Sequence, residues 1–231
     1  MSFSAPPTLN SRQVAEVDRL AQERFGISVD WLMEAAGWQV ARFCTGWTAV
    51  VCGVGNNAGD GLAAARHLHR WGRLASVSCV DADKLKGAAA RERDALASLG
   101  IEIFSELQLD GAESVVDAVF GTGLSRKPEG TFAVWIEAVN DSGLPVIAID
   151  VPSGLDADTG VAYAPCVRAT TTVTLGLAKP GLLKSDGPAV SGDLWIADIG
   201  VPFEAYAAIG VEVPGDLFAK GDTIHVARSA R

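Results

Sequence analysis

The sequence of 231 residues is poor in cysteine and in basic side chains, and each shortage excludes classes of function. Its four cysteines are scattered and form no CxxC pair: Cys44, Cys52, Cys79 and Cys166. This spacing predicts neither a zinc site nor a disulfide framework, and it favours a reducing compartment. Lys and Arg number 19 against 28 Asp and Glu, giving a net charge of −9. That balance argues against nucleic acid as a partner, because phosphate binding needs a basic surface.

Long hydrophobic runs are also missing. No apolar run approaches the roughly 20 residues that a membrane-spanning helix needs. The first residues, MSFSAPPTLNSRQ, lack the apolar segment of a secretory signal. We therefore expect a cytoplasmic protein that makes no membrane contact. Hydrophobic residues still make up 48% of the chain, enough for a sizeable core. We expect a single domain over residues 1–231, with a core of about 10–205 and a tail, 206–231, that we leave unassigned.

What the chain does contain is an alternation of apolar, strand-like runs with helical segments. The first helical segment, for example, places Val14, Val17 and Leu20 at helical spacing. Such alternation implies crossover connections and a mostly parallel central sheet covered on both faces, that is, a three-layer αβα, Rossmann-like domain. The predicted strands are 48–52, 74–80, 101–104, 114–119, 145–149, 171–177 and 194–199, and the predicted helices are 11–24, 29–44, 60–71, 86–99 and 131–141.

A glycine loop, GVGNNAGDG, follows the first predicted strand and begins at Gly53. Residues Gly53 to Ala58 satisfy the dinucleotide fingerprint G-x-G-x-x-G/A, and Asp81 stands where a dehydrogenase has its ribose-binding acid. Against a dehydrogenase, Asp60 places a carboxylate at the predicted helix start, where it would compete with a pyrophosphate. Asp60 fits an N-terminal cap equally well. The loop therefore predicts a ligand site without settling the ligand.

Two further predicted strands carry acids near their carboxyl ends, the edge at which α/β sheets bind ligands. Asp117 lies inside the apolar run VVDAV and would be costly to bury without a partner, although a solvent-facing edge position explains it as well. Asp150 ends the run VIAID, where an α/β enzyme holds a reactive group. We expect Asp156 and Asp158, in the loop that follows, to be solvated or capping acids. Asn, Asp and Ser oxygens at these strand ends predict a site for a hard cation such as K⁺, Na⁺ or Mg²⁺.

Four motifs in this order resemble one family closely: GNNAGDG, VVDAVFGTGLSR, AIDVPSGLDADTG and VTLGLAKPGLL. They are similar to the NAD(P)H-hydrate epimerases, the YjeF N-terminal domain family, and the stretch WLMEAAGWQVA resembles that family's N-terminal helix. The resemblance covers roughly residues 10–205. It implies an isomerase that interconverts the R and S forms of hydrated NADH and NADPH (NADHX and NADPHX). The glycine loop would then look dinucleotide-like because a damaged dinucleotide is the substrate.

The resemblance also implies roles for individual residues. It assigns one K⁺ ion per subunit to Asn57, Asp117 and Ser153, together with nearby backbone carbonyls. Ala58 stands where the family usually has glycine, which matters only if that position needs a positive φ. The substrate-binding residues implied by the family pattern are Asn56, Asn57, Ala58, Gly59, Asp60, Gly121, Thr122, Gly123, Leu124, Ser125, Arg126, Lys127 and Asp150.

The expected reaction passes through loss of the ring hydroxyl to an iminium-like cation, followed by return of water to the opposite face. Such a route needs an acid/base group near the leaving oxygen and negative charge facing the cation. We predict Asp150 for this catalytic role and a structural role for K⁺. For Lys179 we favour an exposed turn position over a substrate contact.

Two other functions stay open at this point. One is an NAD(P)-dependent oxidoreductase built on the Gly53–Ala58 fingerprint, and the other is a non-catalytic nucleotide-binding or scaffold module of the same fold. The resemblance further implies functional coupling to an ATP- or ADP-dependent NAD(P)HX dehydratase and a homodimer, for which the apolar N-terminal helices offer a surface.

Overall fold

The computed structural model describes residues 7–227 and contains a seven-stranded sheet with the order β2-β1-β3-β4-β5-β6-β7. Strands β1 to β6 run parallel, and β7 pairs with β6 in the antiparallel direction. After β1, the chain adds β2 on one side. It then crosses to the other side of β1 and adds β3 to β7 one after another in that direction. The strands are β1 (Thr48–Cys52), β2 (Leu74–Cys79), β3 (Ser114–Ala118), β4 (Val146–Ile149), β5 (Thr171–Leu175), β6 (Asp193–Ala197) and β7 (Thr223–His225).

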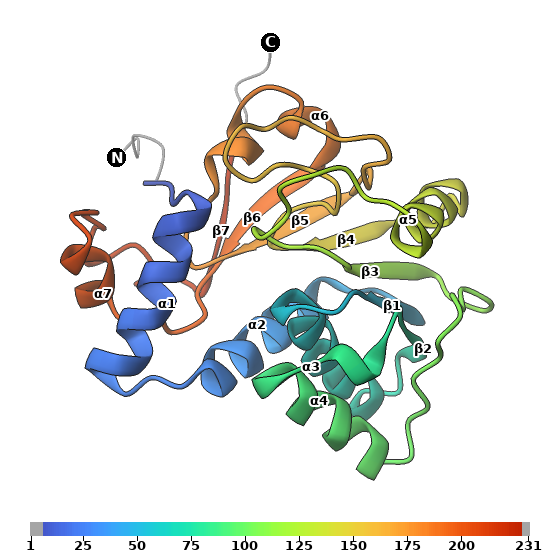
Figure 1. Ribbon diagram of the computed structural model, residues 1–231. Coiled ribbons are helices and arrows are strands. Elements are labelled where there is room, and N and C mark those ends of the chain that lie inside the picture. The colour runs from blue at the N-terminus through green and yellow to red at the C-terminus, as the bar shows by residue number, and fades with distance from the viewer. Residues whose placement is uncertain (1–6, 228–231) are drawn as a thin grey trace.

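Helices cover both faces of this sheet (Figure 1). Side chains of β1 alternate between the two faces: Val50 and Cys52 belong to one buried apolar cluster, with α2, α3 and α4, while Val51 belongs to another, with α5. The helices are α1 (Ser11–Phe25), α2 (Val29–Phe43), α3 (Asn56–Arg70), α4 (Gly87–Ser98), α5 (Thr131–Asp141), α6 (Gly187–Val190) and α7 (Phe203–Ala208), with short 3₁₀ turns at Ala82–Lys84 and Pro180–Leu183. The three-layer αβα architecture with a mostly parallel sheet is confirmed.

Helix α1 stands apart from α3 and α4 and packs with α7 near the β7 edge of the sheet (Figure 1). Its start and end are set locally. Asn10 and Gln13 form a reciprocal capping box, and Gly26 closes the helix in the left-handed conformation at φ 69°. Because α1 does not join the α2–α4 layer, a space opens between them at the carboxyl ends of the central strands.

Two local predictions differ from the structure, and the tail contains elements for which we made no prediction. Residues 101–104 make only an isolated bridge, between Ser78 and Phe104, because a short apolar run flanked by irregular chain does not extend the ladder. Helix α3 begins at Asn56 and not at 60, so the asparagines form its first turn. Strand β7 and helix α7 lie within or next to the tail that we left without assignment.

Two glycines let α3 approach its neighbours closely. A Cβ on Gly61 would lie 2.5 Å from the Cβ of Ala118 in β3, and a Cβ on Gly37 of α2 would lie 2.4 Å from the Cβ of Ala63 in α3. Both positions are buried, so only hydrogen fits there. The contact fixes the N-terminal turn of α3 directly beside the ends of β1 and β3.

Candidate functional site

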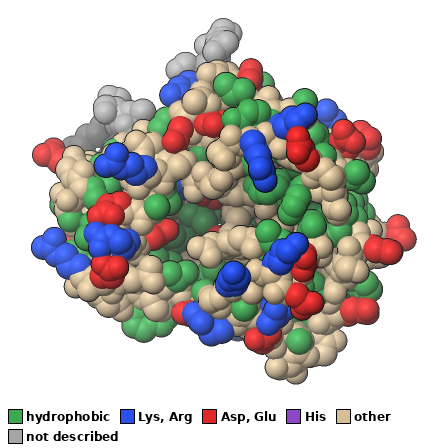
Figure 2. Space-filling view, viewed as in Figure 1, with side chains coloured by type: hydrophobic (Ala, Val, Ile, Leu, Met, Phe, Trp, Pro, Cys, Tyr) green, Lys and Arg blue, Asp and Glu red, His purple; other side chains and the backbone are tan. Residues whose placement is uncertain are grey.

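A cavity of about 540 Å³ lies at the carboxyl ends of the central strands, between α1, α2 and the first turn of α3. Viewed as in Figure 1, the surface is hollowed beside α1 (Figure 2). The size falls within the range of about 300–1,000 Å³ that small-molecule sites occupy. Its lining combines an apolar wall, which includes Leu32, Met33 and Val201, with polar groups from three strand ends.

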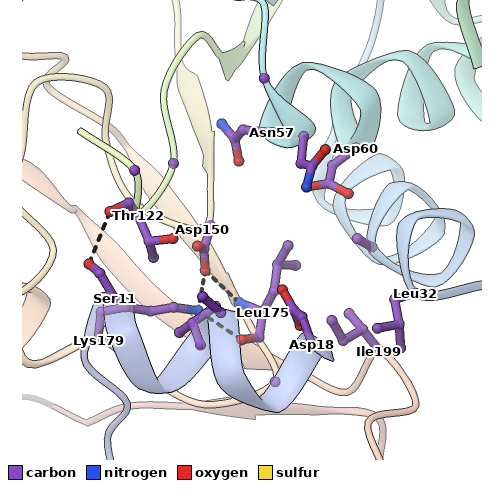
Figure 3. A pocket seen from close by; sticks show the side chains of 18 of the residues that line it. Ser11, Asp18, Leu32, Asn57, Asp60, Thr122, Asp150, Leu175, Lys179 and Ile199 are labelled. Carbon is purple, nitrogen blue, oxygen red and sulfur yellow. Dashed lines mark hydrogen bonds and ion pairs between the residues drawn. The ribbon is translucent and has the colours of Figure 1, made fainter. Parts of the chain in front are cut away.

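Asp150, directly after β4, has a strained backbone. Its φ is 66°, a left-handed conformation that is uncommon for a residue other than glycine. The N–H of Asp150 donates to the carbonyl of Val173 at 2.8 Å, and the N–H of Val151 donates to the carbonyl of Ile149 at 2.8 Å, which closes a tight turn around it. The turn directs the Asp150 side chain into the cavity (Figure 3).

One oxygen of Asp150 is held by three donors. Its Oδ1 accepts hydrogen bonds from the Oγ1 of Thr174 at 3.2 Å and the N–H of Leu175 at 3.1 Å, and it forms an ion pair with the ammonium of Lys179. Within residues 7–227, Oδ2 of Asp150 accepts no hydrogen bond. One oxygen is therefore an anchor and the other is available to a ligand.

Lys179 is buried, with 1% of its surface exposed, which contradicts the exposed turn position that we favoured. Its Nζ also donates to the Leu175 carbonyl at 2.8 Å and to the Thr174 hydroxyl at 3.3 Å. With Asp150, these acceptors match the three protons of an ammonium group. The sequence signal was ambiguous because AKPG does end in a turn, Pro180–Leu183, while the lysine itself points back toward β4.

Asp117 is buried in β3 at 1% exposure, so the solvent-facing edge position is excluded. It accepts hydrogen bonds from Ser153, through the N–H at 2.8 Å and the hydroxyl at 2.6 Å, and from the N–H of Val119 at 3.2 Å. Burial raises the pKa of Asp117 to about 6, although these hydrogen bonds act in the opposite direction. No lysine or arginine of the described chain forms an ion pair with it.

The first turn of α3 brings Asn57 against the loop after β3, and in that loop the N–H of Phe120 donates to the Ser153 hydroxyl. Asn57 is 9% exposed, and a Cβ on Gly121 would lie 3.2 Å from its Oδ1, so its amide packs against the loop after β3. Among the residues that the structure describes, Nδ2 of Asn57 has no hydrogen-bond partner. A buried N–H donor without an acceptor is rare in proteins and points to a ligand atom that accepts from it.

The other residues predicted for the substrate fall into two groups. Asn56, Asn57, Asp60, Gly121, Thr122, Gly123, Leu124 and Asp150 line the cavity. The remaining five do not: Ala58 and Gly59 are buried inside α3, while Ser125, Arg126 and Lys127 are exposed on the surface. Ala58 is helical and needs no positive φ, so its departure from the usual glycine is harmless.

Two glycines of the fingerprint have different tasks. A Cβ on Gly53 would lie 2.0 Å from the carbonyl oxygen of Val119, so Gly53 is required by packing. Gly55, the N-cap of α3, has no atom within 4 Å of such a Cβ and lines the cavity. Free backbone N–H groups at a helix N-terminus attract anions. The backbone here is open to a phosphate group.

Asp60 is the fifth residue of α3 and therefore not its cap. It lines the cavity, and burial together with the negative charges of Asp150 and Asp18 raises its pKa well above the usual range. Asp81, the ribose-binding acid of the dehydrogenase interpretation, forms an ion pair with Lys84 at 2.8 Å and is not part of the cavity lining. The geometry gives the dehydrogenase interpretation no support.

Asp18 is a cavity residue that sequence reasoning missed. It comes from α1, whose first residue crosses to the strand-end loops: the hydroxyl of Ser11 donates to the Thr122 carbonyl at 3.0 Å, and the N–H of Ser11 donates to Asp158 at 2.7 Å. Figure 3 shows Asp18 projecting from α1 into the same space as Asp60 and Asp150. The available signal was an acid four residues after Val14 and three before Ala21, on the apolar side of the helix.

No helix of the described chain is long and apolar enough to cross a membrane. Likewise, residues 7–227 contain no group of three His, Cys, Asp or Glu side chains that could hold a metal ion. A cation at Asp117 would therefore depend on amide, hydroxyl and carbonyl oxygens, the ligands typical of a hard ion and not of a transition metal.

Comparison with known proteins gives consistent results. The family model described as YjeF-related protein N-terminus matches residues 29–181. The NAD(P)H-hydrate epimerase of Rhodopirellula baltica is 33% identical over 210 residues, which cover 86% of this chain and 86% of the relative. The bifunctional NAD(P)H-hydrate repair enzyme Nnr of Thermofilum pendens is 42% identical over 206 residues, covering 82% of this chain and 39% of the relative. The chain spans about two fifths of the length of such bifunctional relatives.

Among solved structures, the crystal structure of yeast ynu0, YNL200c, superposes with a TM-score of 0.78 over 95% of this chain and 100% of that chain, at 22% identity. At this identity the similarity supports the fold alone. The family model covers more than half of the chain, and relatives above 30% identity match it over most of their own length. The chain therefore belongs to the YjeF-related protein N-terminus family.

Proposed function

We propose that this protein is an NAD(P)H-hydrate epimerase that interconverts the R and S forms of NADHX and NADPHX. The observation that carries the proposal is the cavity itself: Asp150, held in a strained turn, presents one free carboxylate oxygen to a space that also opens on the N-terminus of α3. Family membership and relatives named NAD(P)H-hydrate epimerase support the same activity.

The two ends of the cavity suit the two ends of such a substrate. The backbone at Gly55 and Asn56 offers helix N-terminal N–H groups to phosphate oxygens. The nicotinamide ring would lie toward Asp150, beside the apolar residues Leu32 and Met33. In this orientation the phosphates lie at the N-terminus of α3, and the ring is placed next to Asp150.

The chemistry follows from that placement. The hydrate carries its hydroxyl on the carbon beside the ring nitrogen, and the loss of this hydroxyl leaves an iminium-like cation. Negative side chains facing the ring stabilise that cation more than the neutral substrate, which is the condition for catalysis. Asp150, with its free Oδ2, exchanges a proton with the departing or returning water.

K⁺ is proposed for the oxygens of Asn57, Asp117 and Ser153, of which Asn57 alone lines the cavity. The donor set fits a hard cation: the buried carboxylate of Asp117 lacks a cationic partner among the described residues, and Asn57 and Ser153 carry an amide oxygen and a hydroxyl oxygen. Bound K⁺ would supply positive charge to offset Asp117 and would hold the loops after β1, β3 and β4 in register. A monovalent ion is a weak Lewis acid, so this role is structural.

Chromatography of R and S hydrates tests the activity directly. Starting from one epimer, the wild-type protein should bring the mixture to equilibrium much faster than buffer does. Asp150→Asn should keep the fold, by circular dichroism, and lose at least about 100-fold in rate. An unaccelerated R/S equilibration with folded wild-type protein would leave the non-catalytic module as the answer, whereas a change in nicotinamide absorbance would indicate hydride transfer.

Further proposals concern partners and location. We propose coupling to an ATP- or ADP-dependent dehydratase that consumes one epimer, supported by relatives whose names describe a bifunctional repair enzyme. A cytoplasmic location and a homodimer through the N-terminal helices remain predictions. Sedimentation velocity would test the dimer.

A further inference from the structure

Epimerisation through a planar cation requires proton transfer on both faces of the ring. The hydroxyl departs from one face and needs a proton to leave as water. Water then adds from the opposite face and must lose a proton. A single carboxylate on a rigid turn can serve only the face it touches, so the proposed reaction calls for a second proton-carrying group across the ring.

Asp150 cannot serve both faces. Its Oδ1 is fixed by Lys179, Thr174 and Leu175, and the turn at φ 66° fixes its backbone. Only Oδ2 is left for the ring. The partner must therefore project into the cavity from a different wall.

Asp18 meets this requirement in position. It projects from α1, while Asp150 projects from the end of β4, and both line the one cavity (Figure 3). Helix α1 is held against the strand-end loops by Ser11, through Thr122 and Asp158. Along the same apolar face, α1 packs through Val17 and Ala21 into a buried cluster with Tyr206. Asp18 is therefore carried on a fixed wall.

The surroundings of Asp18 favour a carboxyl group that holds its proton to a higher pH than an ordinary aspartate does. Within residues 7–227, its side chain makes no hydrogen bond and no ion pair. The charged and titratable groups that face it are Asp150, Lys179, Asp60 and Tyr206. Burial raises the pKa of Asp18 to about 6, with the charge of Lys179 acting against the shift and that of Asp150 adding to it.

We propose that Asp18 is a second catalytic residue of the epimerase, working on the face of the ring opposite Asp150. This inference rests on the proposed function. In one direction, the C–O bond of the hydrate breaks as the Asp18 carboxyl proton passes to the leaving oxygen, giving water and the ring cation. A water molecule then forms the new C–O bond on the other face and gives its proton to Asp150. Each forward passage leaves the proton on Asp150 and Asp18 ionised, so the reverse direction exchanges the two roles. The forward direction repeats once solvent water takes the proton from Asp150 and returns one to Asp18.

Asp60 is the competing candidate, since it also lines the cavity and, within residues 7–227, its side chain forms no hydrogen bond or ion pair. It lies on α3, one helical turn after the N-terminal groups that we assign to the phosphates. We therefore assign Asp60 to the ribose side of the ligand and include it in the test.

The test compares Asp18→Asn, Asp60→Asn and Glu16→Gln in the R/S equilibration assay. Glu16 lies on the outer side of α1, paired with Arg19 at the surface, and is the matched control. Asp18→Asn should lower kcat by about 100- to 10,000-fold with KM within about threefold of wild type. The wild-type rate should fall as the pH rises above about 6, since the carboxyl proton is then lost, and the residual rate of Asp18→Asn should lack that dependence.

Each other outcome overturns the assignment. An unchanged kcat in Asp18→Asn, a rise in KM alone, or a loss of kcat confined to Asp60→Asn would exclude Asp18 as the acid while leaving an active epimerase. An inactive wild-type protein would instead remove the proposed function. Should Asp18→Asn fail to fold, ¹³C-carboxyl titration of the wild type decides, because a titration of Asp18 below about pH 4 contradicts a proton carrier.

Discussion

The buried ion pair between Lys179 and Asp150 gives a quantitative prediction for Lys179→Met. Methionine keeps most of the apolar stem and removes the ammonium. The change leaves the Oδ1 of Asp150 with two neutral donors, Thr174 and Leu175, and leaves the Leu175 carbonyl without its lysine partner. Removing one partner of a buried pair typically costs about 3–5 kcal/mol. Because Oδ2 of Asp150 faces the cavity and can be hydrated, we expect the lower end, about 3 kcal/mol.

Urea unfolding measures the loss of unfolding free energy in four proteins: wild type, Lys179→Met, Asp150→Asn and the double variant. The double variant should be less destabilised than the sum of the single variants, by about 2 kcal/mol, because its two losses concern one interaction. Lys127→Met is the control, since the Nζ of Lys127 lies 3.6 Å from Glu129 on the surface and should contribute less than about 1 kcal/mol. A Lys179→Met variant within 1 kcal/mol of wild type, or strictly additive effects, would show that the pair is not a buried, coupled unit.

Three further predictions follow from the same geometry. Gly55→Ala should fold normally and raise KM severalfold in the equilibration assay, because its Cβ enters only the cavity. Gly61→Ala should instead lower the unfolding free energy by about 1–3 kcal/mol, because its Cβ would lie 2.5 Å from the Cβ of Ala118. Equal thermal stability of the two variants would contradict the packing argument. Added K⁺ should raise the melting temperature of wild type more than equimolar choline does and should lose this effect in Asn57→Ala, as differential scanning fluorimetry would show; equal responses to the two salts would remove the K⁺ site. Finally, a pKa of Asp18 raised from 3.8 to about 6 means that the folded protein binds this proton more tightly than the unfolded chain does, so wild-type stability falls as the pH rises from about 4 to 6. Asp18→Asn should therefore be more stable than wild type above pH 6 and equal to it below pH 4. A difference in unfolding free energy that stays constant across pH would refute the raised pKa.

The architecture could be predicted from the sequence because its signal is repeated along the chain. Each parallel strand is an apolar run, and each crossover helix shows its own periodicity, so one wrong segment, 101–104, leaves the sheet intact. Strand β7 carried no such signal, because it has three residues, Thr223–His225, and joins an edge. Local patterns specify buried central strands better than short edge strands.

The acids at the strand ends could be predicted from the sequence, whereas Asp18 and Lys179 could not. Asp117 and Asp150 stand in or directly after apolar strands, and parallel strands bring their carboxyl ends together. Asp18 lies on α1, whose position over the cavity depends on long-range contacts such as Ser11 with Thr122. Lys179 depends on a turn that sends its side chain back toward β4. Contacts between residues far apart in the chain leave no local pattern to recognise.

The acids at the carboxyl end of the sheet occupy positions that do not favour folding, unlike the loop acids nearby. Asp156 and Asp158 accept N–H groups in a loop, which stabilises the fold at their positions. Asp18, by contrast, lies unpaired on an apolar helix face, Asp117 lies inside an apolar strand, and Asp150 sits in a left-handed turn. Each of these three positions is unfavourable for an isolated acid, and all three converge on one end of the sheet. None of these three acids is explained by a gain in folding stability at its own position. Unfavourable positions that cluster at one site are typical of functional sites, where the chemistry requires them.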